Sequence, residues 1–209
     1  MGLFKIVNKQ VRRTRDWIFN ALLSLLDEKK YEDIKIANIT EKAGVARQSF
    51  YRNYEGKDDI ISKFIENLFS DFNERLDAME KEAKKSGKDP DYSGIYLLFF
   101  EIMFEYRSDL LKLKNASLSH LIYNNFWICS NKMIEAFFRE SKLDEEKLFF
   151  VKYQLGGIIA AAVEWVYNDM LTTPAEQAKI LSACTFPFAD DPFCLPKLIE
   201  NVRRKNRKT

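Results

Sequence analysis

The sequence of 209 residues has few residues that break helices and almost no histidine: seven glycines, five prolines and one histidine. So few glycines and prolines favour long helices, because these are the two residues that a helix interior tolerates least. A Ser-His-Asp or Cys-His nucleophilic pair would have to use His120. This residue lies amid apolar residues of a helical stretch, where a structural histidine is the simpler interpretation. No GxGxxG or P-loop motif occurs, so we expect a protein that is not an enzyme.

The three cysteines, Cys129, Cys184 and Cys194, are too widely spaced for a disulfide framework or a zinc site. We therefore expect reduced thiols, a cytoplasmic location, and neither metal nor cofactor. No apolar run approaches the ~18 residues that cross a membrane, and the first residues do not form a signal peptide. These absences predict a protein without a membrane partner.

The composition is that of a globular protein, with 46% hydrophobic and 31% charged residues. With few breakers and no alternating β-branched stretches, it predicts an all-α fold. Charge is unevenly distributed, since residues 1–57 hold 12 Lys and Arg against 7 Asp and Glu, and residues 58–196 hold 15 against 23. A basic N-terminal module beside an acidic body is typical of phosphate binding, although surface lysines are common in any protein.

Residues 36–57 organise the chain. Ile36, Ile39 and Ala43 have the spacing of one helical face, and Gly44 follows at a place suited to a left-handed helix end. A second helix, predicted over 47–54, carries Phe50 on its core side and polar residues around it. A short helix, a glycine corner and a second polar helix predict a helix-turn-helix, whose second helix can enter a major groove.

The run GVARQSFYRNYEGKDDII, residues 44–61, resembles the TetR family of transcriptional regulators. The resemblance covers about the first 65 residues. Ala46 departs from it, because serine or threonine often caps the recognition helix there. The matching positions are Gly44, Val45, Tyr51, Tyr54 and Lys57.

The resemblance implies a helix-turn-helix DNA-binding domain over residues 1–56 and a helical ligand-binding and dimerisation domain over 57–209, with a linking helix over 57–80. It also implies that Lys57 grips a phosphate and that a small-molecule effector changes the spacing of two DNA-binding heads. The expected function is a dimeric, ligand-responsive regulator, most simply a repressor, that binds a palindromic double-stranded operator.

Individual side chains suit different parts of DNA. Arg47 and Gln48 are the best candidates for reading bases, since arginine bonds guanine and glutamine bonds adenine through two hydrogen bonds. The cluster Arg12, Arg13 and Arg15 suits either a phosphate or a solvated face. The candidates for phosphate contacts are Ser49, Tyr51, Tyr54 and Lys57, and Arg52 suits either role.

Further helices are predicted over 9–30, 117–140 and 143–170, with a linker over 81–91, a helix start at Pro174 and a short helix over 198–204. Ser141 is the expected cap of the helix over 143–170. That helix is rich in small residues, which let two helices approach closely. We interpret it as a dimer seam, because a palindromic operator needs a two-fold partner; core packing is the alternative. The small residues are Gly156, Gly157, Ala160, Ala161 and Ala162.

The body is also rich in aromatic residues. They suit an apolar pocket for the effector or an ordinary core. A further interpretation is an activator or coactivator-type helical protein that docks a protein partner through its body. The pocket candidates are Phe100, Phe104, Phe126, Trp127, Tyr153 and Trp165.

Overall fold

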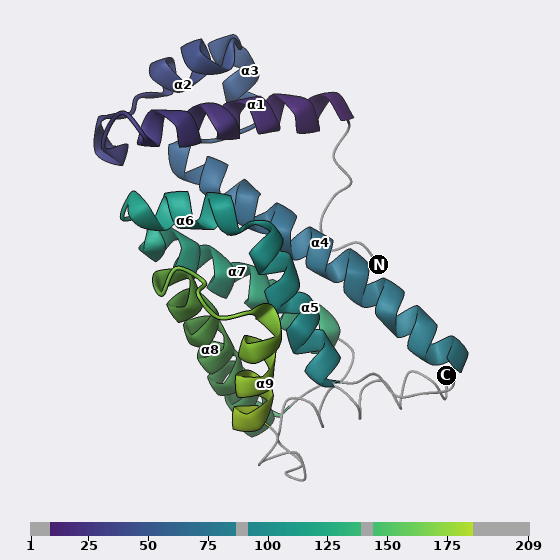
Figure 1. The fold of residues 1–209 in the computed structure, drawn as a ribbon. Coiled ribbons are helices and arrows are strands. Elements are labelled where there is room, and N and C mark those ends of the chain that lie inside the picture. The colour runs from purple at the N-terminus through teal and green to yellow at the C-terminus, as the bar shows by residue number, and fades with distance from the viewer. Residues whose placement is uncertain (1–8, 87–91, 139–143, 186–209) are drawn as a thin grey trace.

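The computed structural model describes residues 9–86, 92–138 and 144–185, and within these ranges it contains helices and no strand, which confirms the all-α prediction. The first three α-helices form one end of the molecule, and a long fourth helix leads from that end into a body of five helices (Figure 1). The elements are α1 (Lys9–Leu26), η1 (Tyr31–Asp33), α2 (Ile36–Ala43), α3 (Arg47–Tyr51), α4 (Lys57–Ser86), α5 (Tyr92–Glu105), α6 (Arg107–Asn115), α7 (Ser119–Phe138), α8 (Glu145–Tyr167) and α9 (Pro174–Thr185).

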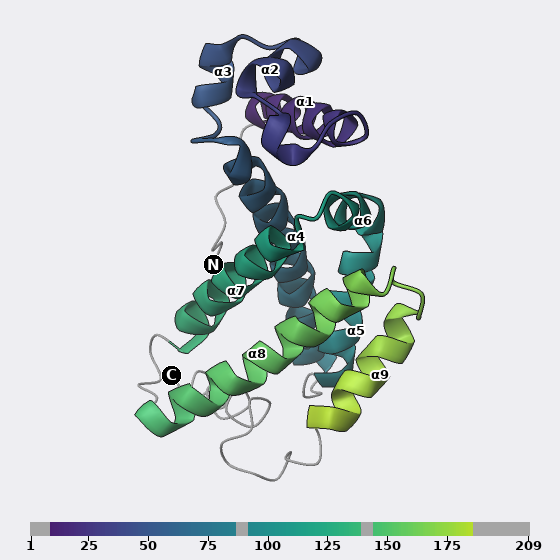
Figure 2. The same ribbon diagram turned by 90° about the vertical axis from the view of Figure 1, so that its left-hand side faces the viewer.

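The body packs against the length of α4. Helices α5 and α7 contact α4, α9 packs on α5, and α8 packs on α7 (Figure 2). The two ends of the molecule share one continuous set of buried residues, from Ile18 in α1 to Trp165 in α8. At the junction, the rings of Phe19 and Phe64 stack at 4.6 Å between α1 and α4. The α1–α3 end is therefore packed on the base of α4.

Several predicted helix ends differ from the structure, among them the end of α8, which lies at Tyr167 rather than at 170. Helix α1 ends at Leu26 rather than at 30, and its chain turns there with the amide of Lys29 donating to the Leu25 carbonyl at 2.9 Å. Helix α3 ends at Tyr51 rather than at 54. Helix α4 continues to Ser86, beyond the predicted end at 80, because residues 81–86 are mostly strong helix formers.

The start of α8 is capped by Asp144, whose carboxylate accepts the Lys147 amide at 2.9 Å. The predicted cap, Ser141, and the predicted helix over 198–204 lie outside the described residues. The start of α9 at Pro174 is confirmed. Thr173 and Glu176 form a reciprocal capping box there, in which the Thr173 amide donates to the Glu176 carboxylate at 2.7 Å and the Glu176 amide donates to the Thr173 hydroxyl at 3.2 Å.

Among the described helices, α8 is long and apolar enough to cross a membrane by length and composition, which corrects the expectation that no such stretch exists. This is weak evidence for a membrane, because core helices pass the same test. In this structure Val151, Ile159 and Val166 of α8 are buried in the protein core. A core role accounts for part of its hydropathy, since 39% of its most apolar stretch is buried.

We expect the two cysteines within the described residues to differ sharply in reactivity. Cys129 in α7 is buried, and burial raises the pKa of its thiol to about 11, whereas Cys184 in α9 is exposed. The thiolate is the reactive form. Iodoacetamide should therefore modify Cys184 and spare Cys129 in the folded protein, as peptide mass spectrometry would detect. Equal labelling of both before unfolding would contradict this packing.

Candidate nucleic-acid interface

The corner between α2 and α3 has the geometry that a helix-turn-helix requires. Gly44 adopts φ 64° and ψ 34°, the left-handed conformation that glycine accepts without a Cβ penalty. Its amide donates to the carbonyl of Glu41, and the Val45 amide donates to the Thr40 carbonyl at 3.0 Å. These bonds satisfy the end of α2 and redirect the chain into α3. As the sequence indicates, Ala46 provides no side-chain cap for α3.

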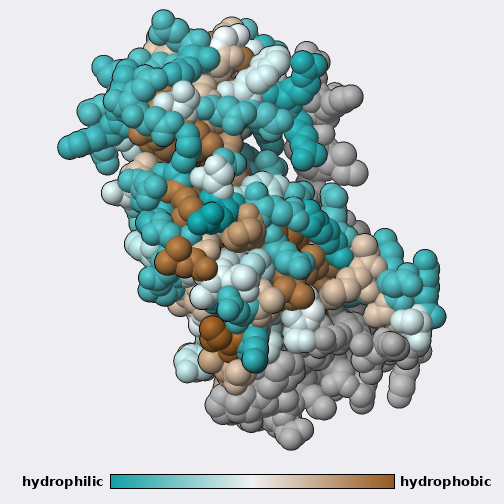
Figure 3. Space-filling model, viewed as in Figure 1, coloured by the Kyte–Doolittle hydropathy of each residue, from teal (hydrophilic) through white to brown (hydrophobic). Residues whose placement is uncertain are grey.

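Helix α3 presents a polar surface around one buried anchor. Phe50 is fully buried (0% exposed), whereas Tyr51 is 60% exposed and Arg47, Gln48 and Arg52 are exposed. Hydrophilic residues predominate on this end of the molecule (Figure 3). The side chains that suit base edges and phosphates therefore lie together on the outer side of α3.

Two hydrogen-bonding features hold the end of α3. The side-chain amide of Asn53 donates to the Ser49 carbonyl at 2.7 Å, and the Arg52 guanidinium donates to the Gln48 carbonyl at 3.4 Å. Ser49 is partly buried and receives a second donor from Arg52 on its hydroxyl at 3.4 Å. These local bonds keep Arg52 close to the helix surface beside Ser49.

Tyr54 does not have the exposure that a phosphate contact through its side chain needs. It is 3% exposed, packs against Phe50 at 5.6 Å between ring centroids, and donates from its hydroxyl to the Arg15 carbonyl at 3.4 Å. Burial raises the pKa of Tyr54 well above its ordinary value, with Arg15 opposing the shift, so the hydroxyl stays protonated as a donor. The prediction for Tyr54 is corrected to a core residue that joins the end of α3 to α1.

Lys57 is also engaged within the protein. Its ammonium lies 2.5 Å from the Tyr31 carbonyl and 3.2 Å from the Ile34 carbonyl, and it sits 4.2 Å from the centroid of the Tyr31 ring. No local sequence pattern indicates these partners, because they come from residues more than 20 positions away in the chain.

The arginines of α1 divide between two environments. Arg12 and Arg13 are exposed, and the Arg13 guanidinium lies 5.4 Å above the Trp17 ring. The Arg15 guanidinium lies 5.9 Å from the Tyr54 ring centroid. Arg15 is thus tied to the end of α3, while Arg12 and Arg13 remain at the surface beside it.

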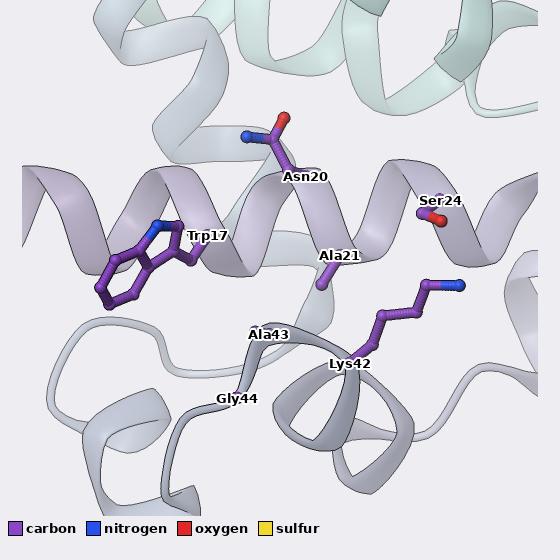
Figure 4. Close-up of a pocket in the computed structure, with 7 residues that line it drawn as sticks. All are labelled: Trp17, Asn20, Ala21, Ser24, Lys42, Ala43 and Gly44. Atoms are coloured by element: carbon purple, nitrogen blue, oxygen red, sulfur yellow. The ribbon is translucent and has the colours of Figure 1, made fainter.

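A groove of about 460 Å³ lies between α1 and the end of α2. Figure 4 shows the Trp17 indole at one end of it and the Lys42 side chain at the other. The ammonium of Lys42 is paired with Glu28. The groove is open to solvent at the side of the helix-turn-helix and contains none of the predicted pocket residues. Its lining is Trp17, Asn20, Ala21, Ser24, Lys42, Ala43 and Gly44.

The six predicted pocket residues do not share one environment. Phe100, Phe126 and Trp165 are buried in the core, whereas Phe104 and Tyr153 are exposed. Phe104 stacks on Trp165 at 6.2 Å between centroids. Trp127 is partly buried beside Gly156, with its ring 3.8 Å from where a Cβ would stand.

The small residues of α8 also differ in burial. Ala162 is fully buried in the core of the same chain, which removes it from the predicted dimer seam. Gly157 and Ala160 are exposed, and Ala161 is partly buried. His120 is exposed on α7, so the expectation of a structural histidine among apolar neighbours is also corrected.

Comparison with known proteins finds partial similarity to two regulators and no matching family model. The chain is 27% identical over 101 residues to the biofilm operon icaADBC HTH-type negative transcriptional regulator IcaR of Staphylococcus epidermidis, which is 47% of this chain and 50% of that protein. It is 32% identical over 73 residues to the uncharacterized HTH-type transcriptional regulator YxbF of Bacillus subtilis, which is 34% of this chain and 19% of that protein. The chain thus spans half or less of the length of these curated relatives.

A solved TetR transcriptional regulator from Streptococcus agalactiae covers 84% of this chain and 95% of its own, at 19% identity and a TM-score of 0.49. A likeness at this level carries no weight by itself. A helix-turn-helix is instead indicated by the Gly44–Val45 corner, the exposed polar side of α3 and the partial sequence similarity to two HTH-type regulators. These observations identify the chain as a helix-turn-helix protein that is similar over part of its length to transcriptional regulators.

Proposed function

We propose that this protein is a DNA-binding transcriptional regulator that acts as a ligand-responsive repressor on a palindromic operator. The observation that carries the proposal is the outer side of α3, where Arg47, Gln48 and Tyr51 are exposed around the buried anchor Phe50. Such a helix can insert its side chains into a major groove while its core side stays fixed. The protein would act in the cytoplasm and carry out no catalysis.

The proposed partner that completes the palindrome is a second copy of the chain. An apolar stripe runs along the exposed side of α8, where Phe149 is 73% exposed and Tyr153 is 71% exposed, and Gly157 and Ala160 continue it at helical spacing up to the exposed Glu164. A stripe of this kind on a single chain marks a surface that another molecule covers. An isologous pair built on α8 would present two α3 helices related by a two-fold axis, as a palindrome requires.

The proposal also includes a small apolar effector that binds in the body. Its support is the accessible aromatic surface made by Phe104, which stacks on the buried Trp165. An effector that prefers one arrangement of the body would shift the two heads toward or away from the spacing of the operator. The proposed effector site involves only the body, so the protein could bind DNA even if it binds no effector.

Replacing Arg47 or Gln48 with alanine should weaken binding about 10- to 100-fold at the preferred DNA sequence, because a bidentate base contact contributes ~1–3 kcal/mol. The duplex would be selected from a random pool with the wild-type protein and its affinity measured by fluorescence anisotropy. Loss of the Arg47 or Gln48 side chain should also relax the sequence preference at one or two base pairs.

Lys179→Ala, at an exposed position on α9, is the matched control and should bind as the wild type does. The wild-type affinity should fall steeply as salt rises, since phosphate contacts release counterions. If the selection yields no preferred sequence, or Arg47→Ala and Gln48→Ala both bind like Lys179→Ala, then α3 does not read DNA.

A further inference from the structure

The ammonium of Lys57 is enclosed by backbone carbonyls. It lies 2.5 Å from the carbonyl oxygen of Tyr31, 3.2 Å from that of Ile34 and 3.4 Å from that of Glu32. An ammonium has three N–H donors, and these three acceptors match them. The Tyr31 ring adds a cation–π contact at 4.2 Å. The carbonyls and ring therefore leave the ammonium no free donor for an external phosphate.

The next residue in the chain binds the same tyrosine from its other end. The Tyr31 hydroxyl donates to the Asp58 carboxylate at 2.5 Å. Burial and this hydrogen bond raise the pKa of Tyr31 above its ordinary value, so the phenol stays protonated and keeps donating. Tyr31, Lys57 and Asp58, here named the Tyr31 clamp, thus join η1 to the first turn of α4.

The position of the Tyr31 clamp allows it to restrain the recognition helix, α3. Helix α2 begins three residues after η1, and α4 begins six residues after the end of α3, so the clamp closes the loop that contains the whole helix-turn-helix. Tyr54 ties the other side of α3 to α1. A cation in the first turn of a helix opposes the helix dipole, and the carbonyls of η1 offset that cost for Lys57.

We propose that Lys57 is a positioning residue that fixes the orientation of α3 relative to α4, in place of the phosphate contact that the family resemblance implies. This inference rests on the proposed DNA-binding function for its effect on operators. It also makes a claim about the free protein, namely that Lys57 holds η1 against α4.

The test compares Lys57→Met, which keeps the apolar stem and removes all three donors, with the wild type. A phosphate contact contributes about 0.9 to the slope of log affinity against log salt. If Lys57 acts through the Tyr31 clamp, Lys57→Met should keep the wild-type salt slope. It should also discriminate less between the selected operator and operators whose half-sites are one base pair closer or farther apart. A general loss of stability would not change that discrimination. Lys30→Met, at an exposed position next to η1, controls for the loss of one charge in this region.

Amide hydrogen exchange gives a readout without DNA. Exchange over residues 31–36 should be at least about tenfold faster in Lys57→Met than in Lys30→Met, as expected from the loss of hydrogen bonds to a charged group. Tyr31→Phe removes only the bond to Asp58 and no charge, so it should speed exchange in the same segment and leave the salt slope unchanged.

A salt slope that falls by about 0.9 in Lys57→Met overturns the proposal, whatever the exchange rates. Unchanged exchange over residues 31–36, or unaltered spacing discrimination in a variant whose slope is unchanged, also overturns it. If the wild type binds no selected duplex, the proposed function fails. The exchange comparison then decides whether the Tyr31 clamp exists.

Discussion

Replacing Phe50 with alanine is expected to lower the free energy of unfolding by about 3–5 kcal/mol, the usual cost of truncating a buried aromatic side chain. Phe50 is fully buried and contacts the rings of Tyr51 and Tyr54 at 5.4 and 5.6 Å between centroids. A domain is typically stable by only about 5–15 kcal/mol. The loss should therefore detach the α1–α3 end from the cooperative unfolding of the body, as chemical denaturation followed by circular dichroism would show.

Tyr51→Ala is the matched comparison, because it truncates the neighbouring aromatic residue on the exposed side of the same helix. We expect it to cost less than about 1.5 kcal/mol of stability, the upper value for one aromatic pair, and to weaken DNA binding. The two variants should therefore separate folding from recognition. If Tyr51→Ala destabilises the protein as much as Phe50→Ala, then the assignment of inner and outer sides of α3 is wrong.

Tyr153→Glu is expected to dissociate the proposed dimer. In an isologous interface each substitution occurs twice, so losing the burial of two tyrosine side chains costs about 3–6 kcal/mol before the charge is counted. This corresponds to at least about a hundredfold weaker association. Analytical ultracentrifugation would show a monomer at concentrations where the wild type is a dimer, and operator affinity should fall with it.

Trp17→Glu makes a similar change at an exposed aromatic residue of α1, in the α1–α3 end rather than in the body, and should leave association unaltered. A wild-type protein that sediments as a monomer at all concentrations would contradict the dimer. In that case the exposed α8 stripe would favour the alternative of a different protein partner.

Much of the helix-turn-helix follows from local rules. Gly44 occupies the left-handed corner that its place after Ala43 predicts, and the apolar spacing puts Ile39 and Phe50 in the core. These features depend on residues within one or two helical turns of each other. The same local reasoning correctly predicts the start of α9, since the threonine, proline and glutamate that define it are consecutive or nearly so.

The errors arise where distant residues decide the outcome. Tyr54 is buried because Arg15 and Phe50 enclose it, and Arg15 lies 39 positions earlier in the chain. Likewise, the partners of the Lys57 ammonium are the carbonyls of Tyr31, Glu32 and Ile34, more than 20 positions earlier in the chain, and no local pattern indicates them. Ala162 and Gly157 are both small residues of α8, yet Ala162 faces the core and Gly157 faces solvent. Composition alone does not fix that rotation.

The length of α4 has a mechanical consequence. Its 30 residues form a rod of about 45 Å at 1.5 Å per residue. When a rod of this length tilts by about five degrees at one end, its other end moves by about 4 Å. That displacement is close to the rise of one base pair, about 3.4 Å. A tilt of α4 together with the body helices packed on it would thus put α3 out of step with DNA by a whole base pair.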